Sequence, residues 1–439
     1  MTQTAAPVPP DAPAPAPGLL RNRSYLLVMS GLTTEALGAG IAVFAVPLIA
    51  LSLTGSVWQA GVVTAVGHTG ALLATLPAGV IADRVDRRRL IVLTASIAAL
   101  AWTAAAVAAV TGQLSVWHLG GVLLASSVAG AFVEPAVAGA FRSVVPQEQL
   151  ATAYAASQGR DAAAGLVAGP VGGVLYGIAH AVPLVAAAVG HLATAVCTWL
   201  VREPLNADTA AARAVRPVVA LREGLRYVWS VPLFRLCLGL FAVINIAING
   251  MFVAITLDLA DGGTSPARIG LLSGVVGASM LIGAVLAPTI VKRVRVGRLT
   301  PVALGLVAVA AGVMAVDQSY WGYVVALGAG VLLVPAANAA MAGYSAAITP
   351  PRLQGRFSSV MDLCATVAMP LAPLVGSGLL TLIGIGPTLL ALSGLLGVTV
   401  VAVWCARPLR RIGRPETWAD DVVDPGGQAA DQPPSEART

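Results

Sequence analysis

The sequence predicts an all-α membrane protein with twelve transmembrane helices in two pseudo-symmetric six-helix bundles. First, the 439 residues are 57% hydrophobic and only 10% charged, which is far more apolar than a soluble globular protein. Second, twelve apolar runs approach or exceed the ~20 residues that span a bilayer. Third, a polar segment follows the sixth run, and the halves on either side of it repeat one another.

The twelve predicted spans are bounded by charged or turn-forming residues. They are Tyr25–Leu53, Ala60–Ile81, Leu90–Val110, Trp117–Phe141, Ala151–Ile178, Pro183–Arg202, Leu236–Leu259, Gly270–Val291, Leu299–Val316, Trp321–Ile348, Phe357–Leu382 and Pro387–Cys405. The predicted organisation is a tail over 1–22, an N-terminal bundle over 23–202, a linker over 203–232, a C-terminal bundle over 233–411 and a second tail over 412–439.

The segments outside the bundles are polar or low in complexity. Residues 1–22 are rich in Pro and Ala and lack the basic start and apolar core of a signal peptide, and residues 412–439 are polar and acidic. Both are predicted to be disordered cytoplasmic tails. In the linker, Leu221–Val228 carries apolar residues at helical spacing with arginines opposite them, which predicts an amphipathic helix on the membrane surface.

Lysine and arginine predict the orientation in the membrane. Outside the spans they fall in the tails, the linker and the loops of one side, and only Arg268 lies in a loop of the other side. Loops rich in Lys and Arg stay in the cytoplasm, so both termini and the linker are predicted to be cytoplasmic. The same topology explains the net charge of +6, since the basic residues form no single face for nucleic acid.

An internal repeat supports the division into halves. A shift of 209 residues sets Ala60-Gly61 against Ile269-Gly270, and Asp83-Arg84-Val85 against Lys292-Arg293-Val294. Duplicated halves with a binding site between them are the usual plan of secondary transporters. The second copy has Lys292 in place of Asp83, so the acidic residue occurs only once.

A charged hinge over 79–89 separates the second and third spans. It has the pattern Gly-x-x-x-Asp-Arg-x-x-Arg-Arg, formed by Gly79, Asp83, Arg84, Arg87 and Arg88. This pattern resembles the signature loop between helices 2 and 3 of the major facilitator superfamily of secondary transporters. The resemblance implies a cytoplasmic gate that locks the halves together when the cavity is open outward, with Asp83 near the start of the eleventh span. Anchoring by positive charge alone is the alternative, and it leaves the glycine and the aspartate unexplained.

A second motif lies in the fifth span and consists of Gly165, Gly169, Pro170 and Gly173. It resembles the glycine-proline motif of the family's exporters, shortened by one residue before the paired glycines. Small residues let helix backbones meet closely, which suits a moving interface, and ordinary close packing is the alternative.

The hinge, Val144–Pro146, Glu223–Tyr227 and Pro351–Arg356 together look like the bacterial drug and siderophore exporter branch of that family, similar to macrolide and enterobactin exporters. This likeness covers nearly the whole chain outside the tails. It implies a multi-pass protein of the bacterial cytoplasmic membrane.

Five ionisable side chains lie inside the predicted spans, where each costs roughly 2.5 to 3.5 kcal/mol at mid-bilayer. They are Glu35, Glu134, Arg160, Asp161 and Asp362. Counted from the nearest predicted boundary, they share one layer roughly 15 to 20 Å deep. Charges at one depth near the midplane predict a network for proton coupling or substrate binding.

The short turn between the fourth and fifth spans predicts that these helices are antiparallel neighbours, with Glu134 opposite Arg160. Adjacent residues such as Arg160 and Asp161 point about 100° apart on a helix and are not expected to face each other. Arg160 is therefore expected to pair with Glu134 or Glu35, which leaves another acid free to exchange a proton. A static ion network that fixes helix packing is the alternative.

Two further features bear on proton coupling. Proton-coupled antiporters of the family often carry an arginine in the fourth span, four residues before a glycine; here that position, counted back from Gly130, is Ser126. Arg160 is the candidate replacement. His68 and His191 are isolated in the second and sixth spans and are expected to serve packing or hydrogen bonding.

The resemblance also implies where substrate would bind, since spans one, four, seven and ten line the central cavity in this superfamily. The candidate contacts are Phe44, Phe132, Asn245, Asn249, Phe252, Asn338 and Met341. Contact with neighbouring helices is the alternative for the polar ones. A mostly apolar lining with few polar groups suits bulky amphipathic compounds.

These features predict a monomeric exporter of a small amphipathic compound that works by proton antiport and alternating access, without a cofactor. An importer or facilitator and a non-transporting receptor are the alternatives. The sequence shows no nucleophile or metal-ligand spacing, so an enzyme is not expected. The four cysteines fall within or at the edge of apolar runs and are predicted to be core residues.

Overall fold

The computed structural model describes residues 18–82, 84–206, 217–416 and 418, which are largely α-helical and contain no strand. The first half comprises α1 (Arg23–Thr54), α2 (Val57–Ala82), α3 (Arg87–Val110), α4 (Val116–Val144), α5 (Leu150–Ile178) and α6 (Ala181–Leu200). The second comprises α8 (Pro232–Asp261), α9 (Pro266–Arg293), α10 (Val296–Val316), α11 (Tyr320–Val331), α12 (Val334–Ile348), α13 (Pro351–Ala368), α14 (Leu371–Ile383) and α15 (Ile385–Cys405). Between them lies α7 (Pro217–Ser230), and short helices η1 (Leu19–Arg21), η2 (Gln147–Gln149) and α16 (Arg407–Arg410) complete the chain.

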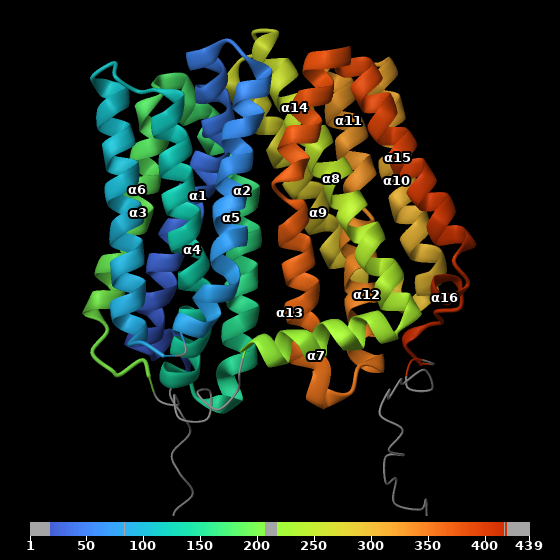
Figure 1. Ribbon diagram of the computed structural model, residues 1–439, viewed down its shortest axis with the longest axis horizontal. Coiled ribbons are helices and arrows are strands. Elements are labelled where there is room, and N and C mark those ends of the chain that lie inside the picture. The colour runs from blue at the N-terminus through green and yellow to red at the C-terminus, as the bar shows by residue number, and fades with distance from the viewer. Residues whose placement is uncertain (1–17, 83, 207–216, 417, 419–439) are drawn as a thin grey trace, which may run out of the picture.

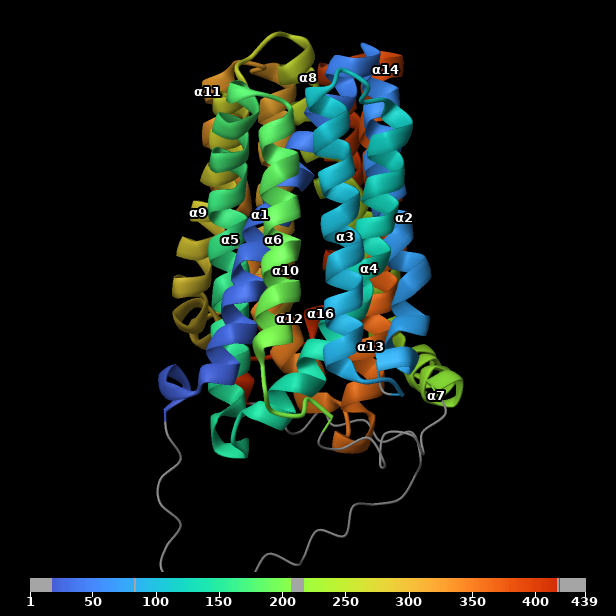
Figure 2. The same cartoon turned by 90° about the vertical axis from the view of Figure 1, so that its left-hand side faces the viewer.

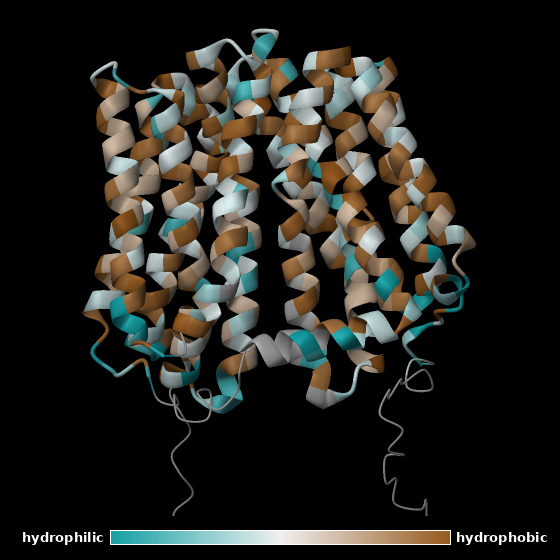
Figure 3. Ribbon diagram, in the orientation of Figure 1, coloured by the Kyte–Doolittle hydropathy of each residue, from teal (hydrophilic) through white to brown (hydrophobic). Residues whose placement is uncertain are grey.

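The long helices run side by side in two groups, α1–α6 and α8–α15, while α7 lies across one end of the molecule (Figure 1). Within the described residues, eleven segments are long and apolar enough to cross a bilayer. The remaining predicted span is α2, 26 residues long, which packs along α4. Hydrophobic residues dominate the length of the spans, and hydrophilic ones gather at the end that carries α7 (Figure 3). The predicted twelve-helix membrane fold is therefore confirmed.

Capping residues and glycine or proline mark where several of these helices begin, end or break. The Asn22 side chain accepts a hydrogen bond from the Tyr25 backbone N–H and caps α1, and Asp86 caps α3 inside the charged hinge. Gly55 closes α1 with a φ of 62°, a left-handed conformation that glycine adopts at little cost. The tenth and eleventh spans are each broken once, between α11 and α12 and before α14 at Pro370.

The two halves repeat one pattern of helix neighbours. In the first half, α1 packs on α5 and α6, α3 on α4 and α6, and α2 on α4 (Figure 2). In the second, α8 packs on α14 and α15, α10 on α11 and α15, and α9 on α11 and α12. This equivalence confirms the two pseudo-symmetric bundles. The same contacts correct one prediction: α4 and α5 hardly touch, because each packs on other helices despite the short turn between them.

We call the end that carries α7 and residues 79–89 the hinge side, and the opposite end the far side. On the far side, two buried clusters combine residues of both bundles: one joins Ala254 and Leu257 of α8 to the N-terminal core, and the other joins Leu48 of α1 to the C-terminal core. On the hinge side each bundle keeps its own cluster. Among the described residues, the two bundles therefore share buried clusters at the far side and have separate clusters at the hinge side.

The bundle boundaries extend beyond the predicted ones. Leu205, assigned to the linker from the sequence, is buried in the N-terminal core on the hinge side. Ile412 and Trp418, assigned to the disordered tail, are buried in the C-terminal core, where the Trp418 ring meets Tyr344 edge-on at 5.8 Å. Large apolar side chains keep these flanking segments on the bundles. The amphipathic helix expected at Leu221–Val228 lies within α7, and residues 1–17 and 419–439 lie outside the described residues.

Candidate functional site

A polar chain inside the N-terminal bundle joins four helices. The indole Nε1 of Trp102 on α3 donates to Ser126 Oγ on α4 at 2.9 Å. Ser126 Oγ lies 3.3 Å from Nε2 of His191 on α6, and His191 Nδ1 lies 3.2 Å from Oε1 of Glu35 on α1. This last contact is close enough for an ion pair but is not aligned as a hydrogen bond, and Glu35 Oε2 is buried without a hydrogen-bond partner among the described residues.

Glycines bring α1 and α6 close enough for Glu35 and His191 to meet. A Cβ on Gly190, the neighbour of His191, would lie 2.7 Å from the Thr34 carbonyl oxygen, and a Cβ on Gly38 would collide with the Ala186 carbonyl. Small residues that allow backbone contact are the usual device for packing helices in membranes. The close approach of the helix backbones therefore sets the distance between the carboxylate and the imidazole.

The polar chain lines a cavity of about 260 Å³ bounded by α1, α2, α3, α4 and α6. His68 and Thr64 of α2 contribute polar groups to the same space, and most of the remaining lining is apolar. Val43 at its edge is 59% exposed, so the cavity is not sealed. The sequence treated His68 and His191 as isolated residues; the structure brings both to one cavity with Glu35.

Among the described side chains of the predicted charged layer, only Arg160 and Asp161 form an ion pair with each other. The Nε and Nη2 atoms of Arg160 both donate to Oδ1 of Asp161, at 3.1 and 2.7 Å. The expected pairing of Arg160 with Glu134 or Glu35 is therefore wrong, as is the expectation that Arg160 and Asp161 do not face each other. The long guanidinium side chain folds back to its neighbour, while α4, which carries Glu134, does not pack on α5.

The remaining acids have different surroundings. Glu134 is exposed, and half of the Asp161 side chain is exposed. Ionisable side chains in a membrane span are expected to face water or protein rather than lipid. The side chain of Asp362 on α13 lies outside the part of the chain that the structure describes, so its place in the layer stays a prediction.

The charged hinge is held by the N-terminal bundle. Arg87 is 6% exposed, and its Nη1 donates to the Leu205 carbonyl at 3.1 Å. Arg88 Nη2 donates to the Glu203 carbonyl at 2.6 Å, Arg84 is exposed, and Gly79 has open space beside it. Because Asp83 lies outside the described residues, the predicted lock toward the eleventh span remains untested.

The glycine-proline motif lies at the far-side contact between the bundles. A Cβ on Gly169 would meet Ser273 of α9 at 2.5 Å, and a Cβ on Gly173 would collide with the Pro266 carbonyl. Pro170 lies against Gly274, where a Cβ would come within 2.8 Å of its ring. Gly165, in contrast, faces open space. Gly270 and Gly274 of α9 form the other side of this contact. The sequence pattern did not predict that they pack against α5, although Gly270 belongs to the internal repeat.

The predicted substrate contacts are mostly half-buried. Asn245 and Asn249 donate from Nδ2 to carbonyls of their own helix, α8, both at 2.9 Å. Phe44 packs into the far-side core against Gly172, whose Cβ would lie 3.0 Å from its ring. Asn338 is exposed, and Phe132, Phe252 and Met341 are half-buried. Their role in binding substrate remains a prediction.

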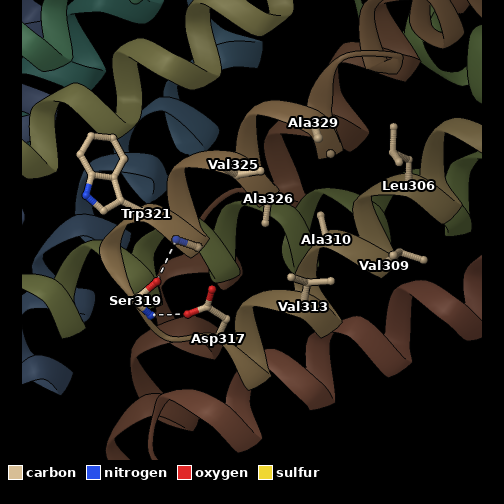
Figure 4. Close-up of a pocket in the computed structure, with 12 residues that line it drawn as sticks. Leu306, Val309, Ala310, Val313, Asp317, Ser319, Trp321, Val325, Ala326 and Ala329 are labelled. Carbon is tan, nitrogen blue, oxygen red and sulfur yellow. Dashed lines mark hydrogen bonds between the residues drawn. The ribbon is translucent and has the colours of Figure 1, made fainter.

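A larger hollow of about 510 Å³ lies between α10 and α11 (Figure 4). Its lining is apolar except at one end, where the backbone N–H of Ser319 donates to Asp317 at 3.0 Å. Hydrogen bonds from Ser319 hold the pKa of the Asp317 carboxyl below its usual range. Val309 and Val325 in this lining are exposed, and neither helix contributes to the main contacts between the bundles. The hollow therefore belongs to the lipid-facing surface of the C-terminal bundle.

Comparison with known proteins identifies drug exporters among the relatives. The chain is 26% identical over 399 residues to the multidrug efflux pump Tap of Mycolicibacterium fortuitum, covering 87% of this chain and 95% of that protein. It is 25% identical over 334 residues to macrolide efflux protein A of Streptococcus pyogenes, covering 74% and 81% of the two chains.

Solved structures share the fold at low identity. The nucleoside transporter NupG superposes with a TM-score of 0.71 at 13% identity, covering 87% of this chain and 99% of that one. A bacterial homologue of the human lysosomal transporter Spinster, inward-facing and unoccupied, gives a TM-score of 0.69 at 17% identity, covering 93% and 100%. Residues 28–335 match the family described as Major Facilitator Superfamily. This chain, a multi-pass membrane transporter, belongs to the Major Facilitator Superfamily.

Proposed function

We propose that this protein exports small amphipathic compounds, such as macrolide-type antibiotics, across a bacterial cell membrane in exchange for protons. The hinge side is cytoplasmic in this proposal, as the lysine and arginine distribution favours. Two relatives that align over most of their length are named as efflux proteins for drugs or macrolides, which supports the direction and the substrate class.

The observation that carries proton exchange is the position of Glu35. It is an ionisable carboxylate inside a membrane bundle, it lines a cavity, and its Oε2 has no hydrogen-bond partner among the described residues. Arg160, the one permanent cation of the predicted layer, is paired with Asp161. A carboxylate without a fixed counter-charge can gain and lose a proton within a transport cycle.

The packing of the bundles supports alternating access. The far side is closed by α5 against α9 and by α2 against α14, while the hinge side has separate cores. We infer from this arrangement a state that is open toward the hinge side. Export requires these far-side contacts to separate so that the compound can leave, and rigid-body rocking of two bundles around a shared site is the general mechanism of such carriers.

Counterflow in proteoliposomes tests this function. Purified protein should exchange a labelled macrolide for unlabelled macrolide without a gradient, and an imposed pH gradient should drive net movement. We expect Glu35→Gln to retain exchange and to lose the response to the gradient, because the amide cannot carry the proton. Glu148→Gln, in η2 before α5, is the matched control and should behave as the wild type.

The outcomes separate the alternatives. A wild-type response to the pH gradient in Glu35→Gln would contradict the coupling role of this residue. Saturable binding without exchange would favour a receptor. Greater accumulation of the compound in cells that overproduce the protein would favour an importer or facilitator, whereas reduced accumulation supports export.

A further inference from the structure

The hollow between α10 and α11 has the length and polarity of a site for one membrane lipid. We propose that a phospholipid with a primary ammonium in its headgroup, namely phosphatidylethanolamine, binds there. One acyl chain fills the hollow, and the ammonium donates to the Asp317 carboxylate at the far-side end (Figure 4). This site lies away from the polar chain of the N-terminal bundle and does not depend on the proposed function.

The length of the hollow matches one leaflet of a bilayer. Its lining follows α10 from Leu306 to Asp317 and α11 from Trp321 to Gly330. At about 1.5 Å per residue, this stretch of α10 is roughly 16 Å long. The hydrocarbon core of a bilayer is ~30 Å thick, so one leaflet is about 15 Å deep. An acyl chain that starts at the membrane surface would therefore lie along the whole hollow.

Small residues form the hollow, and apolar side chains border it. The two helices touch at Gly330, where a Cβ would lie 2.8 Å from the Cβ of Ala310. Ala326 in the lining is buried, whereas Val309 and Val325 are 64% and 69% exposed. This surface faces the hydrocarbon of the bilayer, where lipid tails are as apolar as the valines. A lipid acyl chain is therefore the molecule that covers it.

A negative charge lies at the far-side end of the hollow. Asp317 directly follows α10, outside the spans, and is exposed. The backbone N–H of Ser319 donates to its Oδ1 at 3.0 Å, and hydrogen bonds from Ser319 hold the pKa of this carboxyl below its usual range. Within the described chain, no basic side chain lies within ion-pair distance of Asp317. A lipid ammonium supplies a counter-charge that also donates a hydrogen bond.

The surroundings of Asp317 favour a zwitterionic headgroup. Trp321 is 72% exposed at the same end, and tryptophan is enriched where a membrane meets water. The neighbouring Tyr320 donates from Oη to the Arg268 carbonyl at 2.9 Å, which brings an arginine of α9 to this end. A carboxylate and an arginine match a headgroup with an ammonium and a phosphate. Phosphatidylglycerol has no ammonium, and the trimethylated ammonium of phosphatidylcholine has no N–H to donate.

Mass spectrometry of the intact purified protein with added lipid measures this selectivity. Phosphatidylethanolamine, phosphatidylcholine and phosphatidylglycerol with the same acyl chains are compared by the dissociation constant of the first bound lipid. We expect phosphatidylethanolamine to bind about fivefold more tightly than phosphatidylcholine, as one exposed ion pair allows. Equal binding of these two lipids by the wild type, or tighter binding of phosphatidylglycerol, would overturn the proposal without any variant.

Two variants assign the preference to this hollow. Asp317→Asn keeps the shape of the side chain and removes its charge, so it should bind phosphatidylethanolamine no more tightly than phosphatidylcholine. Ala329→Phe, at an exposed position of the lining, places a ring in the hollow and should weaken the binding of both lipids.

Matched controls lie outside the hollow. Asp261→Asn removes an exposed charge at the far-side end of α8, and Val398→Phe enlarges an exposed side chain of α15, so both should bind lipid as the wild type does. A wild-type preference retained in Asp317→Asn, or unchanged binding of both lipids in Ala329→Phe, would contradict the site. Thermal unfolding establishes that each variant is folded, and the wild-type comparison decides the headgroup preference if a variant does not fold.

Discussion

Arg87 is a buried side chain that fixes the charged hinge to the N-terminal bundle. Its guanidinium is buried beside Gly139 of α4, its Nη1 bonds the Leu205 carbonyl, and its backbone N–H donates to Asn206 Oδ1 at 3.1 Å. Among the described residues it has no carboxylate within ion-pair distance. The Leu205 carbonyl thus takes the place of the acidic partner that a buried arginine usually has.

Gly139→Ala should release this arginine. A Cβ at residue 139 would collide with Nε and Cζ of Arg87, so the side chain has to leave the Leu205 carbonyl. Loss of a hydrogen bond from a charged group should lower the free energy of unfolding by about 1.5 to 3 kcal/mol. Thermal unfolding in detergent measures this loss. Gly121→Ala, on the same helix with open space beside it, is the control; an equal loss in both variants would contradict the explanation.

At the scale of elements, the segment Glu203–Asn206, which follows α6, bonds two other helices of the N-terminal bundle, α1 and α3. It accepts hydrogen bonds from Arg87 and Arg88 of α3, and the Glu203 carboxylate accepts one from the Ser24 hydroxyl of α1. The bond from Ser24 is the main reason that the pKa of Glu203 lies below its usual range, with a smaller contribution from the charge of Arg88. The segment is therefore a part of the bundle whose contacts depend on pH.

The lowered pKa of Glu203 predicts how stability changes with acid. Because the folded state favours the ionised carboxylate, its contribution is present above the unfolded-state pKa and is lost as the pH falls through the folded-state pKa. We expect Ser24→Ala to have a lower midpoint of thermal unfolding than the wild type at pH 6. At acidic pH, where Glu203 is protonated in both proteins, the two midpoints should lie closer together. Thr34→Ala, an exposed residue whose hydroxyl donates to the Ser30 carbonyl of its own helix, is the control. A difference from wild type that stays the same at both pH values would contradict this account.

At the scale of the whole molecule, the internal repeat appears as two equivalent contacts between the bundles. Gly61 of α2 meets Ser377 and the Pro373 carbonyl of α14, and its repeat mate Gly270 of α9 meets the backbone of Gly169 on α5. The two contacts close the far side together with the shared clusters. Glycine at the two related positions therefore makes the closed far side possible.

Gly61→Ala and Gly270→Ala should each open the far side. An added methyl group at either contact should destabilise the closed far side by about 1 to 3 kcal/mol. The ratio of closed to open molecules would then fall by roughly 5- to 150-fold. Spin labels at Gln113 and Ser265, one in each bundle on the far side, would report longer distances by pulsed electron paramagnetic resonance. Gly165→Ala, in the glycine-proline motif of α5 but facing open space, should leave the distances unchanged. Unaltered distances in both variants would show that these glycines do not control the closure.

The sequence by itself determined the membrane fold and the six-plus-six plan, because span length, hydropathy and charge are local properties that repeat along the chain. Only the tertiary structure decided which charged groups meet. Arg160 pairs with Asp161, and Glu35 pairs with a histidine that the sequence left isolated. Inside a bilayer all faces of a helix can be apolar, so hydropathy does not specify which helices pack together. Small residues such as Gly190 and Gly270, which allow close backbone contact, determine the packing instead. That fit depends on the rotation of each helix about its axis, which linear spacing does not specify.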